Sequence, residues 1–430
     1  MKERNIDNEQ TYILNCLKGI EIKGLEKIDI SRLMFNVSGE AIKASKVESI
    51  KKLFRTILFN VINVEYDNNG SNLPLVISYN YHRNDHTKYW ERFKSIVSEY
   101  NEIYVEEGRK NYCRLRSPRD ACSVIYDYIH IKKQISIVEN GTIRRVIAIS
   151  IAELLNLKKC LKFKMDYYKS AFIFFDGNKV ENLIVQMLQN NGVKVATMQH
   201  GQPVFHGLDC DRINQTMILN FSSDYIMVTG EFSKKQFVLG GVPEDKIFVG
   251  GSLREIHSVK ESGSDFVVFL DCPTNPNAVR DNVELMGCAQ KISELLGVNY
   301  VIKCHPQDDP LNYIDFSDER GAFLPKGCNL QMALKEKRFG ILHASGVYLD
   351  VLAEGIKAFC YVNDTDFPLV EKGLDSFGNV SELAEKIKKW ESYEISQKQE
   401  YMNKVIDYYL SPRDVENRYK DFVIKLNERK

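Results

Sequence analysis

The sequence lacks most of the features that would set it apart from ordinary globular proteins. Its ten cysteines form no CxxC pair, and it contains neither an internal repeat nor a low-complexity tract. Cysteines such as Cys304 and Cys360 lie in apolar, strand-like contexts, which indicates reduced, buried thiols rather than a zinc site or a disulfide scaffold. No apolar run approaches the roughly 20 residues that cross a bilayer, and the charged start MKERNIDNEQ argues against a secretory signal. We therefore expect a cytoplasmic protein.

An excess of charge of either sign is also absent. Lysine and arginine together number 58, as do aspartate and glutamate, so the chain as a whole offers no electrostatic basis for binding nucleic acid. The apolar fraction of 44% and the charged fraction of 27% are ordinary for a globular protein. A chain of 430 residues can build two or three domains with substantial cores.

Strand and helix signals alternate along the chain. Residues 45–64 carry a helical period of apolar positions, and LPLVISYN (73–80) reads as a buried strand. The tetrapeptide SPRD at 117–120 predicts a helix start with an N-cap serine and a proline at the first helical position, and its second copy at 411–414 predicts the start of the last helix. From Ser170 onward, strands and helices alternate regularly. This order indicates parallel βαβ units, so we predict an α/β fold.

One break in this alternation predicts a domain boundary. The segment HSVKESGSD (257–265) is the best candidate for a linker. We therefore expect a Rossmann-like N-terminal domain with a helical extension at residues 1–256, and a second Rossmann-like domain at 257–395. Residues 396–430 are helical with one charged face, and we expect them to pack back across both domains.

Two strand ends in the C-terminal half carry clustered polar residues. Lys303, His305 and Pro306 follow VNYVI, and His343, Ser345 and Gly346 follow FGIL. Ligands of open α/β sheets bind at the carboxyl ends of the strands, and a helix that starts at Ser345–Gly346 aims backbone N–H groups at an anion. The two loops together predict one site for a phosphorylated ligand. There His305 would act as a general acid or electrostatic clamp on a phosphate, unless it only caps the strand end.

Five segments, in order, resemble a GT-B glycosyltransferase over residues 70–390. They are FFDG (174–177), MQHG (198–201), TGEFSKKQF with GGVPEDKIFVGGSLR (229–254), IKCHP (302–306) and HASGVYLDVLAEGIKAF (343–359). The HP pair followed by a serine is similar to bacterial sialyltransferases, capsule-type Kdo transferases and CDP-glycerol-type teichoic acid polymerases. This resemblance implies two facing Rossmann-like domains with an interdomain cleft and a CMP- or CDP-activated donor.

The resemblance implies that the C-terminal domain binds the nucleotide. Asp350 and Glu354 lie four residues apart on one helix face, and by analogy Asp350 would bind ribose hydroxyls, a solvated helix face being the alternative. Arg254 would reach the pyrophosphate, unless it forms a surface salt bridge. The implied donor-binding set is Arg254, Lys303, His305, Pro306, His343, Ser345, Gly346, Asp350 and Glu354.

An acceptor hydroxyl must lose its proton to a carboxylate or a histidine of the N-terminal domain. Asp176 lies in an FDG segment similar to the acid-acid-Gly motif of bacterial sialyltransferases, although Phe175 replaces the first acid. His200, at a strand end, is the rival base; for both, loop-stabilising hydrogen bonds are the alternative. Further acceptor contacts are expected from His82, Arg83, Asp85, Gln199 and Gly201.

A metal site is not expected. His82 and His86 lie four apart on a predicted loop, a spacing that seldom holds a metal, and Asp364 with Asp366 matches a DxD pattern only formally. The nucleotide sugar is therefore expected as a co-substrate, with no other cofactor.

Together these patterns are interpreted as a bacterial glycosyltransferase that is independent of metal. It would move a sugar from a CMP-, CDP- or UDP-linked donor to a hydroxyl of a growing surface polysaccharide, such as a capsule, or of a lipid-linked glycan. The expected partners are the nucleotide sugar and the acceptor, with peripheral contact to the inner face of the cell membrane as an option. The alternatives are a CDP-polyol phosphotransferase of teichoic acid type, a GT-B-like assembly subunit without activity, and a nucleotide-sugar epimerase.

Overall fold

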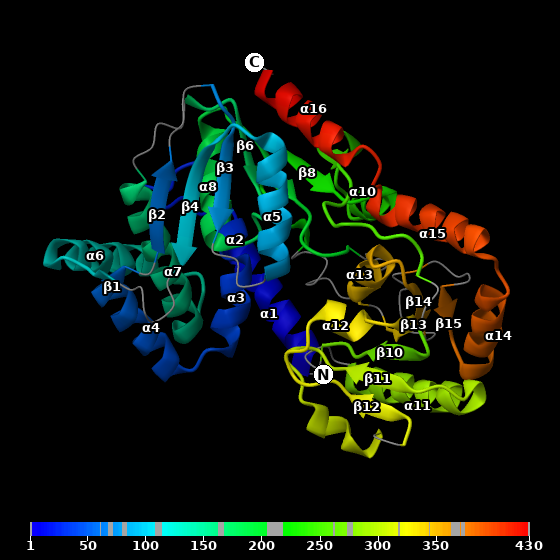
Figure 1. The fold of residues 1–430 in the computed structure, drawn as a ribbon. Helices are drawn as coiled ribbons and strands as arrows, with labels where there is room; N and C mark the ends of the chain where they lie inside the picture. Colours follow the sequence, from blue (N-terminus) through cyan, green and yellow to red (C-terminus); the bar gives the residue numbers. More distant parts are fainter. Residues whose placement is uncertain are drawn as a thin grey trace.

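A computed structural model of the chain describes two lobes, each built on a mainly parallel sheet (Figure 1). The described residues are 2–60, 62–67, 72–79, 84–107, 114–161, 167–203, 218–260, 263–272, 278–316, 319–343, 345–362, 370 and 375–428. Among the helices in these ranges, none has the length and apolar character needed to span a membrane.

The N-terminal lobe contains a seven-stranded sheet of order β2-β4-β3-β6-β7-β8-β9. Only β2 runs antiparallel to its neighbour. The order of the strands reverses between β3 and β6, which makes this the switch point of a doubly wound sheet. The strands are β2 (Ile62–Asp67), β3 (Leu75–Tyr79), β4 (Asn101–Glu107), β6 (Ser170–Ile173), β7 (Lys194–Met198), β8 (Tyr225–Val228) and β9 (Ile247–Val249).

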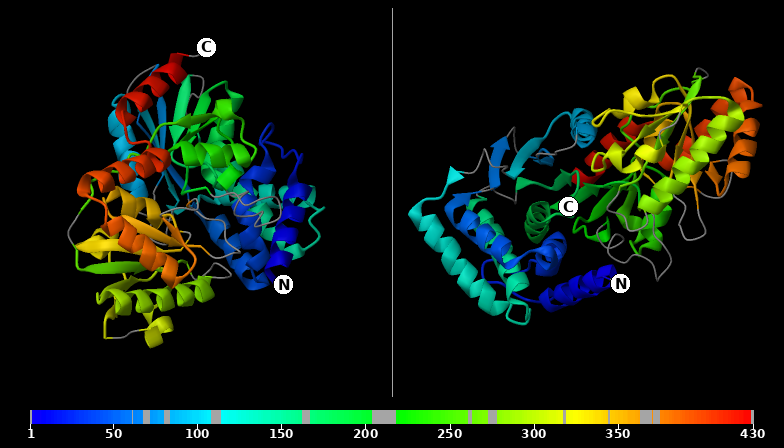
Figure 2. Two further views of the ribbon diagram at one scale, coloured as in Figure 1. Left: turned by 90° about the vertical axis from the view of Figure 1, so that its right-hand side faces the viewer. Right: turned by 90° about the horizontal axis from the view of Figure 1, so that it is seen from below.

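Helices cover both faces of this sheet because successive strand residues point to opposite sides. Leu75 and Ile77 face a core shared with α1–α3 and α6–α8, whereas Val76 faces a core formed with α5 and α16. The last helix of the chain thus completes the N-terminal lobe (Figures 1 and 2). The helices are α1 (Lys2–Leu17), α2 (Ile30–Leu33), α3 (Phe35–Lys43), α4 (Lys46–Leu58), α5 (Asn84–Val97), α6 (Pro118–Gln134), α7 (Gly141–Cys160), α8 (Lys179–Asn190), α10 (Glu231–Leu239) and α16 (Val415–Glu428).

The C-terminal lobe contains a six-stranded, fully parallel sheet of order β12-β11-β10-β13-β14-β15. Numbered along the chain, this is the 3-2-1-4-5-6 order of a Rossmann fold. The prediction of an α/β fold with two Rossmann-like domains is therefore confirmed. The strands are β10 (Asp265–Phe269), β11 (Tyr300–Lys303), β12 (Gly321–Phe323), β13 (Lys337–Leu342), β14 (Lys357–Tyr361) and β15 (Ser376–Phe377).

The helices of this lobe and several short elements complete the described fold. Helix α15 packs on α10 of the first lobe and on α13 of the second, so it contacts both. The elements are α11 (Ala278–Leu296), α12 (Leu330–Leu334), α13 (Val347–Ala353), α14 (Val380–Glu391), α15 (Ile395–Leu410), the 3₁₀ turns η2 (Glu244–Lys246) and η3 (Pro310–Phe316), and the small pair β1 (Phe59–Asn60) with β5 (Arg114–Leu115).

The two SPRD segments behave differently. Ser117 caps α6 as predicted, because its hydroxyl accepts the N–H of Asp120 at 3.2 Å. Ser411 instead ends α15: it has φ +40°, and its N–H donates to the carbonyl oxygens of Ile406 and Asp407. The prediction that the second copy caps the last helix is wrong, since α16 begins only at Val415.

The linker between the two sheets packs against the turn between α13 and β14. The N–H of His257 donates to the carbonyl of Ala353 at 2.8 Å, and that of Lys260 donates to the carbonyl of Gly355 at 3.0 Å. Gly355 has φ +74°, and a Cβ there would overlap the carbonyl oxygen of Ser258. This position therefore requires glycine, both for its backbone conformation and for the close approach. The predicted boundary at residues 256/257 falls within this linker and stays a prediction.

We predict that Gly355→Ala lowers the free energy of unfolding by about 2 kcal/mol or more, because it combines a left-handed conformation with a backbone clash. Gly287, inside α11 with open space around it, is the matched control. Gly287→Ala should raise the free energy of unfolding by about 0.5–1 kcal/mol. Urea denaturation measures both changes, and equal effects of the two substitutions would contradict the required contact.

Candidate functional site

The carboxyl edges of the two sheets both lie beside the start of the linker. Arg92 on α5, the helix after β3, donates through Nη1 to the carbonyl of Leu253 at 2.9 Å. Arg254 pairs through Nε with Oδ1 of Asp350 on α13, the helix after β13, at 2.8 Å. Because each helix follows the carboxyl end of its strand, residues 250–254 mark where the two edges meet. The switch points of doubly wound sheets bind ligands at these edges, so the candidate site is here.

The loop after β11 forms a small hollow of about 110 Å³ with a net positive lining: Lys303, His305 and Lys326, with the buried acid Asp308, which accepts from the Tyr313 hydroxyl at 2.7 Å. The N–H of Gln307 donates to Nδ1 of His305 at 3.2 Å, so the neutral ring carries its proton on Nε2. Burial raises the pKa of Cys304 to about 11, which keeps its thiol protonated near neutral pH. An imidazole N–H donor in a hollow with two lysines suits an anionic group, which is the role predicted for Lys303, His305 and Pro306.

The loop after β13 holds Ser345 and Gly346 at the same edge of the sheet. Ser345 Oγ accepts the N–H of Val347 at 3.4 Å, so the hydroxyl serves as a cap of the short helix α13. His343 is only 5% exposed, and its ring lies 6.0 Å from that of Tyr361. His343 is therefore largely buried, and its predicted contact with a ligand stays a prediction.

Strand β10 lies between β11 and β13, so the two loops are two strand spacings apart. This separation is about 10 Å. The prediction that the two loops together bind one phosphorylated ligand stays a prediction.

Three predicted donor ligands pair with each other or with the linker. Arg254 and Asp350 form the interdomain ion pair, and each retains about a third of its side-chain exposure (34% and 30%). Glu354 accepts from Lys260 at 3.2 Å and lies 4.0 Å from His257. The acids of this face, Asp350 and Glu354, engage cations of residues 254–260, which follow β9 and run along α13. That this face also binds the donor stays a prediction.

Asp176 is fully buried and supports the fold. Its Oδ2 accepts hydrogen bonds from the N–H groups of Ser222 and Ser223, both at 2.9 Å, and from the Ser223 hydroxyl at 2.8 Å. Burial raises the pKa of its carboxyl above the ordinary range, although these hydrogen bonds oppose the shift. The prediction that Asp176 is a catalytic base is wrong, because no acceptor reaches a side chain that is 0% exposed.

His200, the rival base, belongs to a histidine–aromatic cluster formed by His86, Phe174, Phe175 and His200. The His200 ring stacks on Phe175 with a centroid distance of 4.5 Å and meets His86 edge-on at 5.0 Å. Both imidazoles are partly exposed. His200 follows the carboxyl end of β7, His86 lies in the first turn of α5, and the two phenylalanines follow the carboxyl end of β6. An imidazole is suited to general base catalysis near neutral pH.

The sequence suggested His86 only as an acceptor contact on a polar loop, YHRNDH (81–86), and gave it no part in proton transfer. The structure places it on α5, which begins at Asn84. The spacing of Tyr89, Trp90 and Phe93 indicates the helix, and extending that period one turn back would have placed His86 on the face toward the sheet.

The remaining acceptor candidates have mixed outcomes. Gln199 holds its own loop, because its Oε1 accepts the N–H of Thr229 at 3.0 Å and its Nε2 donates to the carbonyl of Gly201 at 2.9 Å. Its acceptor contact stays a prediction, as does that of Gly201, which is exposed with φ +75°. Predicted residues that lie outside the described part of the chain are His82, Arg83, the side chain of Asp85, Asp364 and Asp366.

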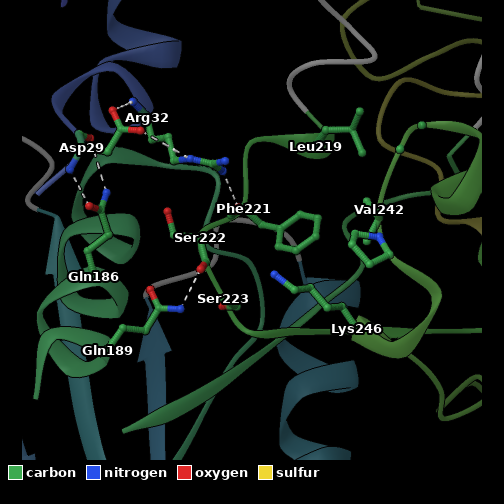
Figure 3. A pocket seen from close by; sticks show the side chains of 13 residues that line it. Asp29, Arg32, Gln186, Gln189, Leu219, Phe221, Ser222, Ser223, Val242 and Lys246 are labelled. Carbon is green, nitrogen blue, oxygen red and sulfur yellow. Dashed lines mark hydrogen bonds and ion pairs between the residues drawn. The ribbon is translucent and has the colours of Figure 1, made fainter. Parts of the chain in front are cut away.

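In the part of the chain that the structure describes, no group of three or more His, Cys, Asp or Glu residues is arranged to hold a metal ion. The larger hollow in this part, about 430 Å³, lies elsewhere in the N-terminal lobe, between α2, α8 and the turn before β9 (Figure 3). Its lining residues Ser222 and Ser223 precede β8, and Gly240–Lys246 precede β9, so they approach the amino ends of the strands. None of the predicted site residues lines it.

We predict that Asp176→Ala destabilises the protein by about 2–4 kcal/mol, because it leaves the buried N–H of Ser223 and the half-buried N–H of Ser222 without an acceptor. Its effect on activity, per folded molecule, should stay within about threefold. Thermal and urea denaturation, together with turnover measured below the unfolding transition, test both statements. A folded Asp176→Ala protein without turnover would restore the catalytic interpretation.

Glu181, one turn into α8, is a second buried carboxyl. It is 1% exposed, receives a hydrogen bond from Asn178 at 3.1 Å, and burial raises its pKa from 4.5 to about 7. Between these pH values the folded state binds the proton more tightly than the unfolded state, so stability falls as pH rises.

Glu181→Gln has no carboxyl to titrate, so it avoids this loss of stability. The difference in the free energy of unfolding between the variant and the original protein should therefore shift in favour of the variant from pH 4.5 to pH 8, by on the order of 2 kcal/mol. Glu400→Gln, at an exposed position of α15, is the control and should give no such gain. Urea denaturation at both pH values measures the difference. A gain independent of pH would show that Glu181 is not the titrating group.

Comparisons with known proteins add little to this geometry. No protein-family model matches the sequence, and a search of curated proteins returned no match. Among solved structures, MnaA of S. aureus with UDP is 10% identical, with a TM-score of 0.49, over 83% of this chain and 97% of that chain. UDP-N-acetylglucosamine 2-epimerase of Rickettsia bellii is 12% identical, with a TM-score of 0.49, over 82% and 96%. TarM, also of S. aureus, is 14% identical, with a TM-score of 0.45, over 64% and 58%.

These similarities are too distant to carry the function of any neighbour to this chain. The strand order of both sheets establishes the α/β architecture with two Rossmann-like domains, independently of these similarities.

Proposed function

We propose that the protein is a glycosyltransferase that moves a sugar from a CMP-, CDP- or UDP-linked donor to a hydroxyl of a surface polysaccharide or a lipid-linked glycan. The observation that carries the proposal is the presence of imidazoles at both carboxyl edges, His305 in one lobe and His86 with His200 in the other. Group transfer needs an acid at the leaving group and a base at the nucleophile, and this arrangement supplies one on each lobe.

The donor side is the cationic hollow after β11. Lys303 and Lys326 lie around it with His305, whose Nε2 carries the proton in the neutral ring. As the bond between the anomeric carbon and the phosphate oxygen breaks, its electron pair stays on the phosphate. The His305 N–H and the two lysines would stabilise that charge, so the proposed reaction requires no metal ion and no further cofactor.

The acceptor side is the histidine–aromatic cluster. His200 would take the proton of the acceptor hydroxyl while the oxygen bonds to the anomeric carbon. The Phe174 and Phe175 rings lie beside the imidazoles, where they hold the ring positions and exclude water on one side. Excluding water favours transfer to the acceptor over hydrolysis of the donor.

The decisive experiment measures release of nucleotide from CMP-, CDP-, GDP- and UDP-sugars, with CDP-glycerol included. His305→Ala should lower kcat/KM for the preferred donor about 100-fold and weaken nucleotide binding. His200→Ala should lower turnover by a similar factor but leave the thermal shift with nucleotide unchanged, because it lies on the other lobe. The control is His130→Ala, whose imidazole is exposed on α6 and bonded to the carbonyl of Tyr126 in its own helix.

Each outcome decides between the alternatives. Turnover of CDP-glycerol alone would identify a polyol-phosphate transferase, and epimerisation of a UDP-sugar without an acceptor would identify an epimerase. A complete lack of turnover and of nucleotide-induced thermal shift would indicate an assembly subunit. A His305→Ala enzyme within about threefold of the original would reject the proposed donor side.

A further inference from the structure

Helix α4 exposes part of its apolar side, although Leu53 on that side packs against the core of the lobe. Its sequence is strongly amphipathic, yet the two fully buried side chains are polar, Ser49 and Thr56. Val47 and Phe54 are both 60% exposed, and Leu58 is 48% exposed. Their spacing of seven and four residues places these three side chains along one stripe of the helix. Arg145 of α7 donates to the Ser49 hydroxyl at 2.8 Å, which fixes the polar side inward.

Helix α6 continues this exposed surface. Ile125 and Ile129 lie one turn apart and are 38% and 45% exposed, and Leu115, just before the helix, is 75% exposed. Helices α4 and α6 pack on each other and on α7, and Leu115 pairs with Phe59 through β1 and β5. We call this surface the α4–α6 face, formed by Val47, Phe54, Leu58, Leu115, Ile125 and Ile129. It lies at the end of the N-terminal lobe away from the C-terminal lobe (Figures 1 and 2).

The same segments are strongly basic although the whole chain is neutral. Residues 46–58 and 114–134 contain nine lysines and arginines against three acidic residues, a net charge of +6. One of those acids, Asp127, is neutralised by Lys159 of α7 at 2.7 Å. The chain as a whole has a formal net charge of zero, so these two segments are basic relative to the rest of the chain. Within them, Lys52 pairs with Glu40 at 3.7 Å and Arg116 donates to the carbonyls of Thr56 and Phe59.

We propose that the α4–α6 face docks on an anionic phospholipid surface. Such a surface offers negative headgroups above an apolar layer, which matches an apolar stripe with basic surroundings. A second copy of this chain fits less well, because a two-fold interface would bring the exposed basic side chains of two copies together. The basic residues attract the headgroups, and Phe54 and Leu115 enter the interface.

The test is co-sedimentation of the full chain with vesicles of phosphatidylcholine containing 30% phosphatidylglycerol, without any nucleotide sugar. The protein should bind these vesicles, bind pure phosphatidylcholine far less, and dissociate in 0.5 M NaCl. Phe54→Glu combined with Leu115→Glu should lower the bound fraction at least about tenfold. The control is Leu239→Glu combined with Leu311→Glu, at positions both 72% exposed, which adds the same charge elsewhere and should keep binding.

Equal binding by the face variant and the original protein would overturn the proposal, as would equal binding to neutral and anionic vesicles. Sedimentation velocity tests the alternative that a second copy of this chain binds the α4–α6 face. A dimer that the face variant abolishes, in a protein that ignores vesicles, would assign the face to a second copy. Because the measurement uses no donor or acceptor, it stands or falls separately from the proposed transferase activity.

Discussion

The contact between the linker and the turn after α13 determines how the two sheets meet. The Arg254–Asp350 pair is its most visible part, but both side chains are about one-third exposed (34% and 30%), and such a pair contributes under about 1 kcal/mol. Backbone contacts contribute more, because Gly355 lets the linker approach and α15 binds both lobes. Ser252 donates to the carbonyl of Leu410 at 2.7 Å, which ties the linker to the end of α15. The candidate site depends on these backbone contacts, since they bring both carboxyl edges beside one segment.

The end of β6 supports the site from within the N-terminal lobe. Phe174 and Phe175 pack against the imidazoles, and the next residue, Asp176, turns inward to bind residues 222 and 223. One short segment therefore positions the cluster on the outside and anchors the chain entering β8 on the inside. A carboxylate that accepts three hydrogen bonds in the interior has a structural role, which explains why a strand-end aspartate does not have to be a catalytic residue.

The sequence predicted what depends on local periodicity and missed what depends on distant partners. Alternating strands and helices indicated two Rossmann-like domains, and residues such as His305 fell at the carboxyl edge because parallel strands share one direction. The spacing of Asp350 showed a helix face, but its partner Arg254 lies 96 residues away and no local pattern links them. In the two SPRD copies, the same four residues begin one helix and follow another, because the preceding chain decides whether the serine is left-handed. Likewise the period of α4 identified its apolar side, but not whether another element covers it.

A neutral total charge concealed how the charges are distributed between the ends of the molecule. One basic region surrounds the α4–α6 face, and another, with Lys303 and Lys326, lies in the C-terminal lobe. Electrostatic attraction acts locally, so the two regions attract different ligands even though the sum is zero. A protein docked through the α4–α6 face would hold its N-terminal lobe against the bilayer and its C-terminal lobe toward the solvent. If the proposed function holds, this orientation would leave the donor side open to nucleotide sugars, which dissolve in water.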